Sequence, residues 1–142
     1  MIGGMDELGS QLADYFRGKA PEVVSAYLFG SRAAGRQHRD SDIDIAVFFD
    51  RDRLPRRRDR SWAAVEMSSD LIALSHCNEV DVVVLNDATP ELAREATENG
   101  VRVFCGDEET DRRFRLQTKL RYIDLIPFLR RNRRIKAETL RS

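Results

Sequence analysis

The feature that most constrains this chain is a pair of short apolar segments with a glycine and serine turn between them. Val23–Phe29 is rich in β-branched and aromatic residues and runs directly into Gly30-Ser31, which predicts a strand that feeds a turn. Ile43–Phe49 has the same character, and its residues alternate between two faces if it is a strand. The sequence therefore predicts two strands with polar residues concentrated in the segment that connects them.

The other elements are predicted to alternate along the chain, as in a sheet layered with helices. Helices are predicted at residues 6–17, 61–75, from the N-cap Thr89 to Gly100 and after Asp107, and further strands at 80–85 and 101–104. The charge run 51–60 predicts a solvated loop, and Pro127 predicts a kink or a break in the last helix. With 142 residues and no internal repeat, the chain is expected to form a single α/β domain. Its core is expected at about residues 20–106 and a C-terminal helical segment at about 107–136.

Charge is distributed unevenly along the chain, although the formal net charge is zero. Residues 1–110 carry 13 basic and 21 acidic side chains, and residues 111–142 carry 11 basic and 3 acidic ones. The basic tail fits an acidic partner surface or nucleic acid, or is a solvated helix end, and nucleic acid is not the favoured partner. The apolar positions of the last helix, which include Phe114, Leu116, Leu120 and Ile123, are expected to pack on their own domain.

Neither membrane insertion nor export is expected. The longest apolar stretches are far shorter than the roughly 20 residues that cross a bilayer. The N-terminus has neither the basic start nor the apolar core of a secretory signal. We therefore expect no membrane partner and a cytoplasmic location.

Two aspartates stand at the start of the second predicted strand, and a third stands in the next one. Asp42 and Asp44 are two residues apart, so an extended backbone places them on the same face. Asp81 lies in an otherwise apolar strand, where an unpaired buried charge would be costly. A hard cation such as magnesium removes the repulsion between carboxylates, and three carboxylates can support two ions in an in-line displacement at phosphorus. Asp42, Asp44 and Asp81 are therefore the candidate catalytic and metal-binding residues, and Asp81 could also accept a proton.

The segment between the two strands has the composition of a phosphate-binding turn. Gly30 has no side chain, so its backbone can approach a phosphate closely, and Ser31 can donate a hydrogen bond. Arg32 and Arg36 can make charge-assisted contacts to phosphate oxygens. Each fragment alone is common in turns, but their ordered combination with the carboxylates predicts a nucleotide site.

Segment 30–35, Gly-Ser-Arg-Ala-Ala-Gly, followed by segment 41–45, Ser-Asp-Ile-Asp-Ile, resembles the signature of the DNA polymerase beta-like nucleotidyltransferase superfamily. The small size resembles its minimal members, the MntA-like (MNT) antitoxins. The resemblance covers about residues 20–130 and implies a small mixed β-sheet flanked by helices, with the three aspartates binding magnesium and the Gly-Ser pair contacting the triphosphate of ATP. Many members have arginine where this chain has Ala34, which leaves Arg32 or Arg36 as substitutes.

Larger relatives of this superfamily add a helical domain that helps to bind the acceptor, and this chain has little room for one. Members that it resembles are encoded with a helical HEPT-type toxin and neutralise the toxin by transferring AMP from ATP to a tyrosine hydroxyl. The resemblance therefore implies the antitoxin of a type VII HEPT/MNT system, an enzyme that forms a hetero-oligomer with its toxin. Two alternatives stay open: transfer to a small molecule such as an antibiotic, and a catalytically silent antitoxin that occludes its partner.

Overall fold

The computed structural model describes residues 3–30, 43–76 and 79–141. The helices are α1 (Gly3–Lys19), α2 (Arg57–Ser75), α3 (Pro90–Arg94) and α4 (Glu108–Arg141), and the strands are β1 (Val23–Phe29), β2 (Ile43–Phe49), β3 (Val80–Val84) and β4 (Val101–Cys105). A 3-10 turn, Leu85–Asp87, follows β3, and a π-helical turn, Glu95–Asn99, continues α3. The predicted order of helices and strands is confirmed, and Thr89 caps α3 as predicted by accepting a hydrogen bond from the Leu92 amide at 3.3 Å.

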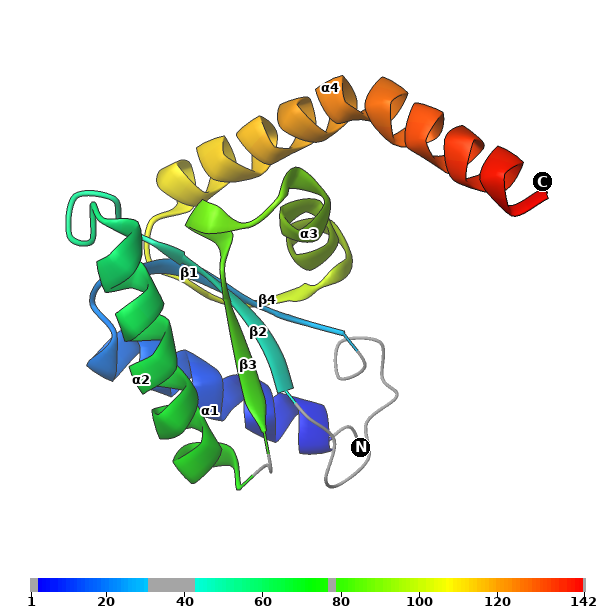
Figure 1. Cartoon of the computed structure of the whole chain (residues 1–142). Helices are drawn as coiled ribbons and strands as arrows, with labels where there is room; N and C mark the ends of the chain where they lie inside the picture. The colour runs from blue at the N-terminus through cyan, green and yellow to red at the C-terminus, as the bar shows by residue number, and fades with distance from the viewer. Residues whose placement is uncertain (1–2, 31–42, 77–78, 142) are drawn as a thin grey trace.

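The four strands form one mixed sheet in the order β3-β2-β1-β4. β1 pairs antiparallel with both β2 and β4, whereas β2 pairs parallel with β3. β2 and β3 therefore begin at the same edge of the sheet, which is also the edge where β1 ends. The predicted α/β class with a mixed sheet and flanking helices is confirmed (Figure 1).

The two faces of the sheet carry separate clusters of buried side chains. α1 and α2 cover one face, and α3 and α4 cover the other (Figure 1). β2 alternates between the clusters, with Ile45 and Val47 on the α1/α2 side and Ala46 and Phe48 on the α3/α4 side. The predicted alternation of this strand is confirmed, and it places Asp44 on the α3/α4 side.

The helices pack through the apolar positions that their periodicity predicts, although α2 buries only part of its set. Leu12 and Phe16 of α1 and Leu71 of α2 are almost completely buried against the sheet. Each such side chain contributes about 1.5–3 kcal/mol relative to leaving it in water. Trp62 and Val65 of α2 remain exposed on its outer side.

The charge run 51–60 is partly helical, so its prediction as a loop is wrong beyond residue 56. α2 begins at Arg57 because Arg60 is fixed by tertiary contacts that the sequence does not display. Its guanidinium donates two hydrogen bonds to Asp87, at 3.1 and 2.8 Å, and a third to the Leu54 carbonyl at 2.9 Å. This ion pair is largely buried, so removal of either partner would leave an uncompensated charge.

α4 is a 34-residue helix that extends beyond the rest of the domain (Figure 1). Pro127 lies inside it without ending it, and Figure 1 shows the helix changing direction in its orange portion, so the predicted kink is confirmed and the predicted break does not occur. Phe114 packs on the sheet side, and its ring stacks on Phe48 with centroids 4.2 Å apart. Leu116, Leu120 and Ile123 are exposed, so the expectation that the apolar positions of α4 pack on the domain is wrong for them. Within the described residues, no helix is both long and apolar enough to span a bilayer.

Candidate active site

Two of the predicted carboxylates lie side by side at one edge of the sheet. In the parallel pairing of β2 with β3, Asp44 is the register partner of Asp81. Neighbouring strands are about 4.8 Å apart, and paired residues of parallel strands point to the same face. Asp44 is half-buried and Asp81 is exposed, so this carboxylate pair, Asp44 and Asp81, opens toward solvent on the α3/α4 side.

Gly30 lies directly against Asp44 of this carboxylate pair. It directly follows β1 and has a φ of +77°, a conformation that side chains strongly disfavour. A Cβ at this position would overlap the Asp44 Oδ2 and lie 3.3 Å from its Cγ. Glycine is therefore required twice here, once by the backbone conformation and once by the carboxylate packed against it.

The structure thus brings together three of the predicted site residues: Gly30, Asp44 and Asp81. The other four, Ser31, Arg32, Arg36 and Asp42, lie outside the described residues.

Asp81 forms no hydrogen bond or ion pair with any residue that the structure describes, and two carboxylates at paired positions repel each other. A hard divalent cation with oxygen ligands suits such a donor set. Within the described ranges no group of three or more metal-ligating side chains is found.

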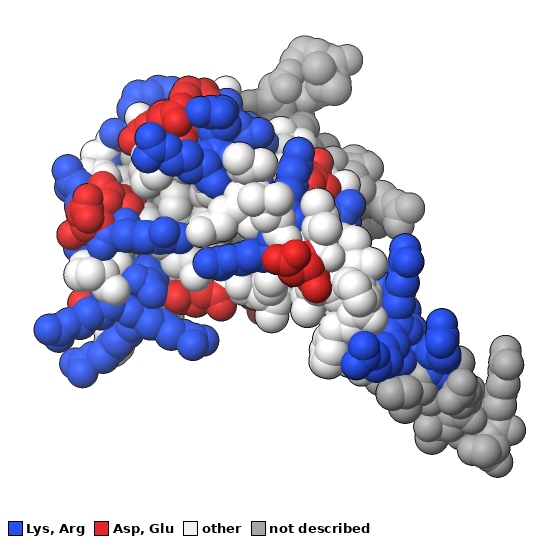
Figure 2. All heavy atoms as spheres, turned by 90° about the horizontal axis from the view of Figure 1, so that it is seen from above, with Lys and Arg blue, Asp and Glu red and all other residues white. Residues whose placement is uncertain are grey.

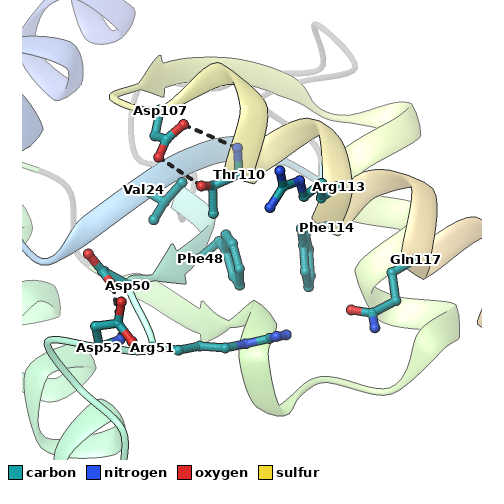
Figure 3. A pocket seen from close by; sticks show the side chains of 10 residues that line it. All are labelled: Val24, Phe48, Asp50, Arg51, Asp52, Asp107, Thr110, Arg113, Phe114 and Gln117. Atoms are coloured by element: carbon teal, nitrogen blue, oxygen red, sulfur yellow. Dashed lines mark hydrogen bonds between the residues drawn. The ribbon is translucent and has the colours of Figure 1, made fainter.

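A hollow of about 450 Å³ lies at the opposite end of β2 (Figure 3). Asp50, Arg51 and Asp52 line it from the sheet side, and Arg113 and Phe114 line it from α4. Six residues of extended chain separate Asp44 from Asp50, which is roughly 20 Å. This hollow is therefore not part of the candidate active site.

A second carboxylate site, which the sequence did not single out, joins α4 to β1. Asp111 of α4 is fully buried and accepts hydrogen bonds from Ser25 Oγ and Tyr27 Oη, both at 2.6 Å. Its Oδ2 also accepts from Arg102 Nη1 and Arg115 Nε, both at 3.0 Å. We call these five residues the Asp111 network.

The Asp111 network keeps its carboxylate ionised. Burial opposes the charge, but the four donors outweigh burial and hold the pKa of Asp111 below its usual value. The same burial, together with the bond to Asp111, raises the pKa of Tyr27. The donors on β1 are 84 and 86 residues away, so the only local signal was Arg115 at i+4 from an acidic residue in the first turn.

The sequence of this chain is similar to those of known nucleotidyltransferases. Residues 10–109 match the family described as polymerase beta, nucleotidyltransferase. A similar protein, the protein adenylyltransferase MntA of Shewanella oneidensis, is 32% identical over 109 residues, which make up 77% of this chain and 73% of MntA. The region that matches the family, residues 10–109, contains Gly30, Asp44 and Asp81.

Two solved structures are similar to the whole fold. A chain from a crystal structure of a toxin–antitoxin complex with AMP-PNP matches with a TM-score of 0.67 and 26% identity, and the match covers 94% of this chain and 98% of the other. A chain from the complex of tri-AMPylated Shewanella oneidensis HEPN toxin with MNT antitoxin matches in fold, with a TM-score of 0.64, 22% identity and coverage of 97% and 99%. The family match spans more than half of the chain. The chain therefore belongs to the polymerase beta nucleotidyltransferase family.

Proposed function

We propose that this chain is an antitoxin that transfers AMP from ATP to a tyrosine hydroxyl of its cognate HEPT-type toxin. The observation that carries the proposal is the carboxylate pair, Asp44 and Asp81, with Gly30 packed against Asp44 at the same sheet edge. The 32% identity to a protein adenylyltransferase and the likeness to a toxin–antitoxin complex with AMP-PNP support it. We place the reaction in the cytoplasm, where ATP is available.

The chemistry is an in-line displacement at the α-phosphorus of ATP. The acceptor oxygen forms a bond to the α-phosphorus, the bond from that phosphorus to the bridging oxygen of the β-phosphate breaks, and pyrophosphate leaves. Asp81 is exposed and accepts the proton of the acceptor hydroxyl or holds a metal ion. Gly30, Ser31, Arg32 and Arg36 are proposed to hold the triphosphate, because glycine allows close approach and the others can donate to phosphate oxygens.

The residues present suit magnesium, because two carboxylates on neighbouring strands supply hard oxygen donors at one edge. We propose that Asp42, Asp44 and Asp81 hold one or two Mg²⁺ ions. Bound magnesium supplies charge neutralisation for the triphosphate and for the leaving pyrophosphate. The half-buried Asp44 is fixed on β2 and limited by Gly30, so it holds one donor at a defined place before substrate arrives.

A transfer assay tests the proposal. The full chain is incubated with α-labelled ATP, magnesium and the purified cognate toxin, and the same assay is run with Asp42→Asn and Asp44→Asn. We expect label on a toxin tyrosine, located by mass spectrometry, and a loss of rate of about 10²-fold or more in both variants. Asp52→Asn is the matched control, because Asp52 is an exposed aspartate beyond the other end of β2 and should leave the rate unchanged.

The remaining alternatives predict different results in the same assay. If toxin inhibition persists in both Asn variants without any label, the chain acts by occlusion and the proposed activity is wrong. If label appears on an aminoglycoside and not on the toxin, the acceptor is a small molecule. Omission of magnesium, or excess chelator, should abolish transfer by the wild-type chain, and a rate that survives chelation would contradict the metal requirement.

A further inference from the structure

We propose that the outer face of α4 is the docking surface for the partner toxin, and that it takes an apolar surface bordered by carboxylates. The surface consists of an apolar stripe, which we define as Leu116, Leu120 and Ile123. The identity of the partner rests on the proposed function, whereas the existence of the stripe does not. Its members are 54%, 56% and 58% exposed, values typical of surface polar residues rather than of large aliphatic ones.

The apolar stripe occupies one side of α4, and the domain packs on the other. Positions i, i+4 and i+7 lie on one face of a helix. Phe114 and Thr118, which are buried toward the sheet and α3, lie about half a turn away from the stripe. The helix therefore has two apolar faces, of which its own domain covers one. A helix that is apolar on two sides normally has a neighbour on each.

Basic side chains border the stripe at both ends and along one side. Arg112 and Arg113 lie one turn before it, and Lys119 lies beside it. The helical spacing continues through the exposed Pro127 to a distal basic group, Arg130, Arg131 and Arg134. Figure 2, which looks down on the molecule from above, shows blue side chains on the described end of this helix beside white surface.

Most of this basic border has no anionic partner of its own. Arg112 and Arg113 share a single acidic residue, Glu109, at 2.8 and 3.2 Å. Lys119, Arg130 and Arg131 form no ion pair with any side chain that the structure describes. An exposed acidic residue, Asp124, also lies beside the stripe, but the basic residues outnumber it, so the charge around this apolar surface is predominantly positive. Its electrostatic complement is an apolar patch edged with Asp and Glu.

The charges argue against a second copy of this chain as the occupant. A parallel pairing of two stripes would place the distal basic group against itself. An antiparallel pairing would place it against the Arg112 and Arg113 end, where one Glu109 serves two arginines. Both arrangements bring like charges together, which costs several kcal/mol in binding.

The apolar side chains argue against nucleic acid as the occupant. Phosphate recognition uses Lys and Arg, and it gains nothing from three exposed aliphatic residues in a row. Burial of Leu and Ile on a protein surface, by contrast, removes apolar area from water and forms the centre of an interface, with charges at its rim. A protein partner can bury the apolar stripe and also pair with the basic residues around it.

The test compares variants of the full chain in binding to the purified cognate toxin by calorimetry. Leu120→Ser combined with Ile123→Ser should raise the Kd at least tenfold, because these residues lie at the centre of the stripe. The matched control is Trp62→Ser combined with Val65→Ser on α2, where two apolar residues are similarly exposed, and it should change the Kd less than twofold. Circular dichroism and urea unfolding confirm that each variant keeps its fold.

The charged border has its own test. Arg130→Glu combined with Arg131→Glu should slow association and reduce its dependence on salt, because rim charges act mainly on the encounter rate. Arg57→Glu combined with Arg58→Glu, two exposed arginines on α2, is the control and should leave association unchanged.

Label transfer measured at toxin concentrations far above the Kd separates this inference from the proposed activity. Stripe variants that bind weakly but transfer AMP at the wild-type rate when saturated support both. If the wild-type chain binds toxin through the stripe but transfers no AMP, the docking surface is supported and the proposed activity is wrong. An unchanged Kd in the stripe variants overturns the docking surface. Self-association of the chain, or RNA binding, that the stripe substitutions abolish also overturns it.

Discussion

Asp111 and the carboxylate pair place acidic side chains in opposite surroundings within one small domain. Asp111 is fully buried, and four donors from β1, β4 and α4 surround it. Asp44 and Asp81 stand at paired positions on neighbouring strands, so two like charges lie next to each other. The first arrangement surrounds a buried carboxylate with donors, whereas the second places an exposed carboxylate, Asp81, beside another acidic residue.

The difference separates residues that stabilise the fold from residues kept for binding. A buried charge is tolerable only when its hydrogen bonds are complete, and the Asp111 network completes them. Adjacent carboxylates lower stability unless a cation is bound between them. The two sites should therefore respond in opposite directions when a charge is removed.

The largest effect is expected from Asp111→Asn. The substitution keeps the shape but removes the charge that Arg102 and Arg115 face, and the amide NH₂ meets donors instead of accepting from them. We expect the free energy of unfolding to fall by about 3 kcal/mol or more in urea titrations at pH 7. Asp14→Asn is the control, because the Asp14–Arg17 pair is exposed and should contribute less than about 1 kcal/mol. Equal losses in the two variants would contradict the role of burial.

Acid should weaken the Asp111 network in a defined pH range. Folding lowers the pKa of Asp111 from its usual 3.8, so the unfolded chain binds this proton more tightly than the folded chain. The contribution to stability is therefore complete above about pH 4 and is lost as the pH falls through the lower pKa of the folded state. Unfolding measured between pH 2 and 6 should show the gap between wild type and Asp111→Asn shrinking below about pH 4. A gap that widens in acid would show that the pKa is raised rather than lowered.

Gly30→Ala should damage the active site more than the fold. The backbone conformation costs a non-glycine residue about 1–2 kcal/mol, and the added Cβ displaces the Asp44 carboxylate. We expect a stability loss of that size and a tenfold or greater loss of AMP transfer. The control is Gly9→Ala, which meets no atom within 4 Å, lies inside α1 and should raise stability by up to about 1 kcal/mol. Full transfer by Gly30→Ala would show that Asp44 does not need its present position.

The parts of the fold that the sequence could predict are those with local causes. The strands β1 and β2 and the N-cap Thr89 follow from side chains within a few residues of each element. The same holds for the start of α4, where the Thr110 amide donates a 3.1 Å hydrogen bond to Asp107. Strand alternation also predicted the face of β2 on which Asp44 lies, whereas Asp42 lies outside the described residues. The pairing of Asp44 with Asp81 then required only that the two strands be parallel neighbours.

The parts that escaped prediction depend on contacts between distant segments. The start of α2 depends on the bonds from Arg60 to Asp87, and Asp111 depends on donors from β1. The exposure of Leu116 and Leu120 could not be read from periodicity, since α4 is apolar on two faces and packing decides which of them meets the sheet. No local sequence pattern predicts the start of α2, the bonds of Asp111 or the exposed face of α4.

Asp81→Asn is expected to have the smallest effect on stability and the opposite sign. In the presence of chelator, removal of one of two like charges at paired positions should raise the free energy of unfolding by about 0.5 kcal/mol. Added magnesium and ATP should stabilise the wild-type chain more than the variant, because the variant has lost a ligand. Urea titrations with chelator and then with both ligands measure the two differences. A loss of stability in chelator would mean that Asp81 supports the fold as Asp111 does, and the contrast between the two carboxylate sites would fail. A gain of stability in chelator, accompanied by a loss of AMP transfer, would show that Asp81 serves ligand binding. It would also show that this function lowers the stability of the chain without ligand.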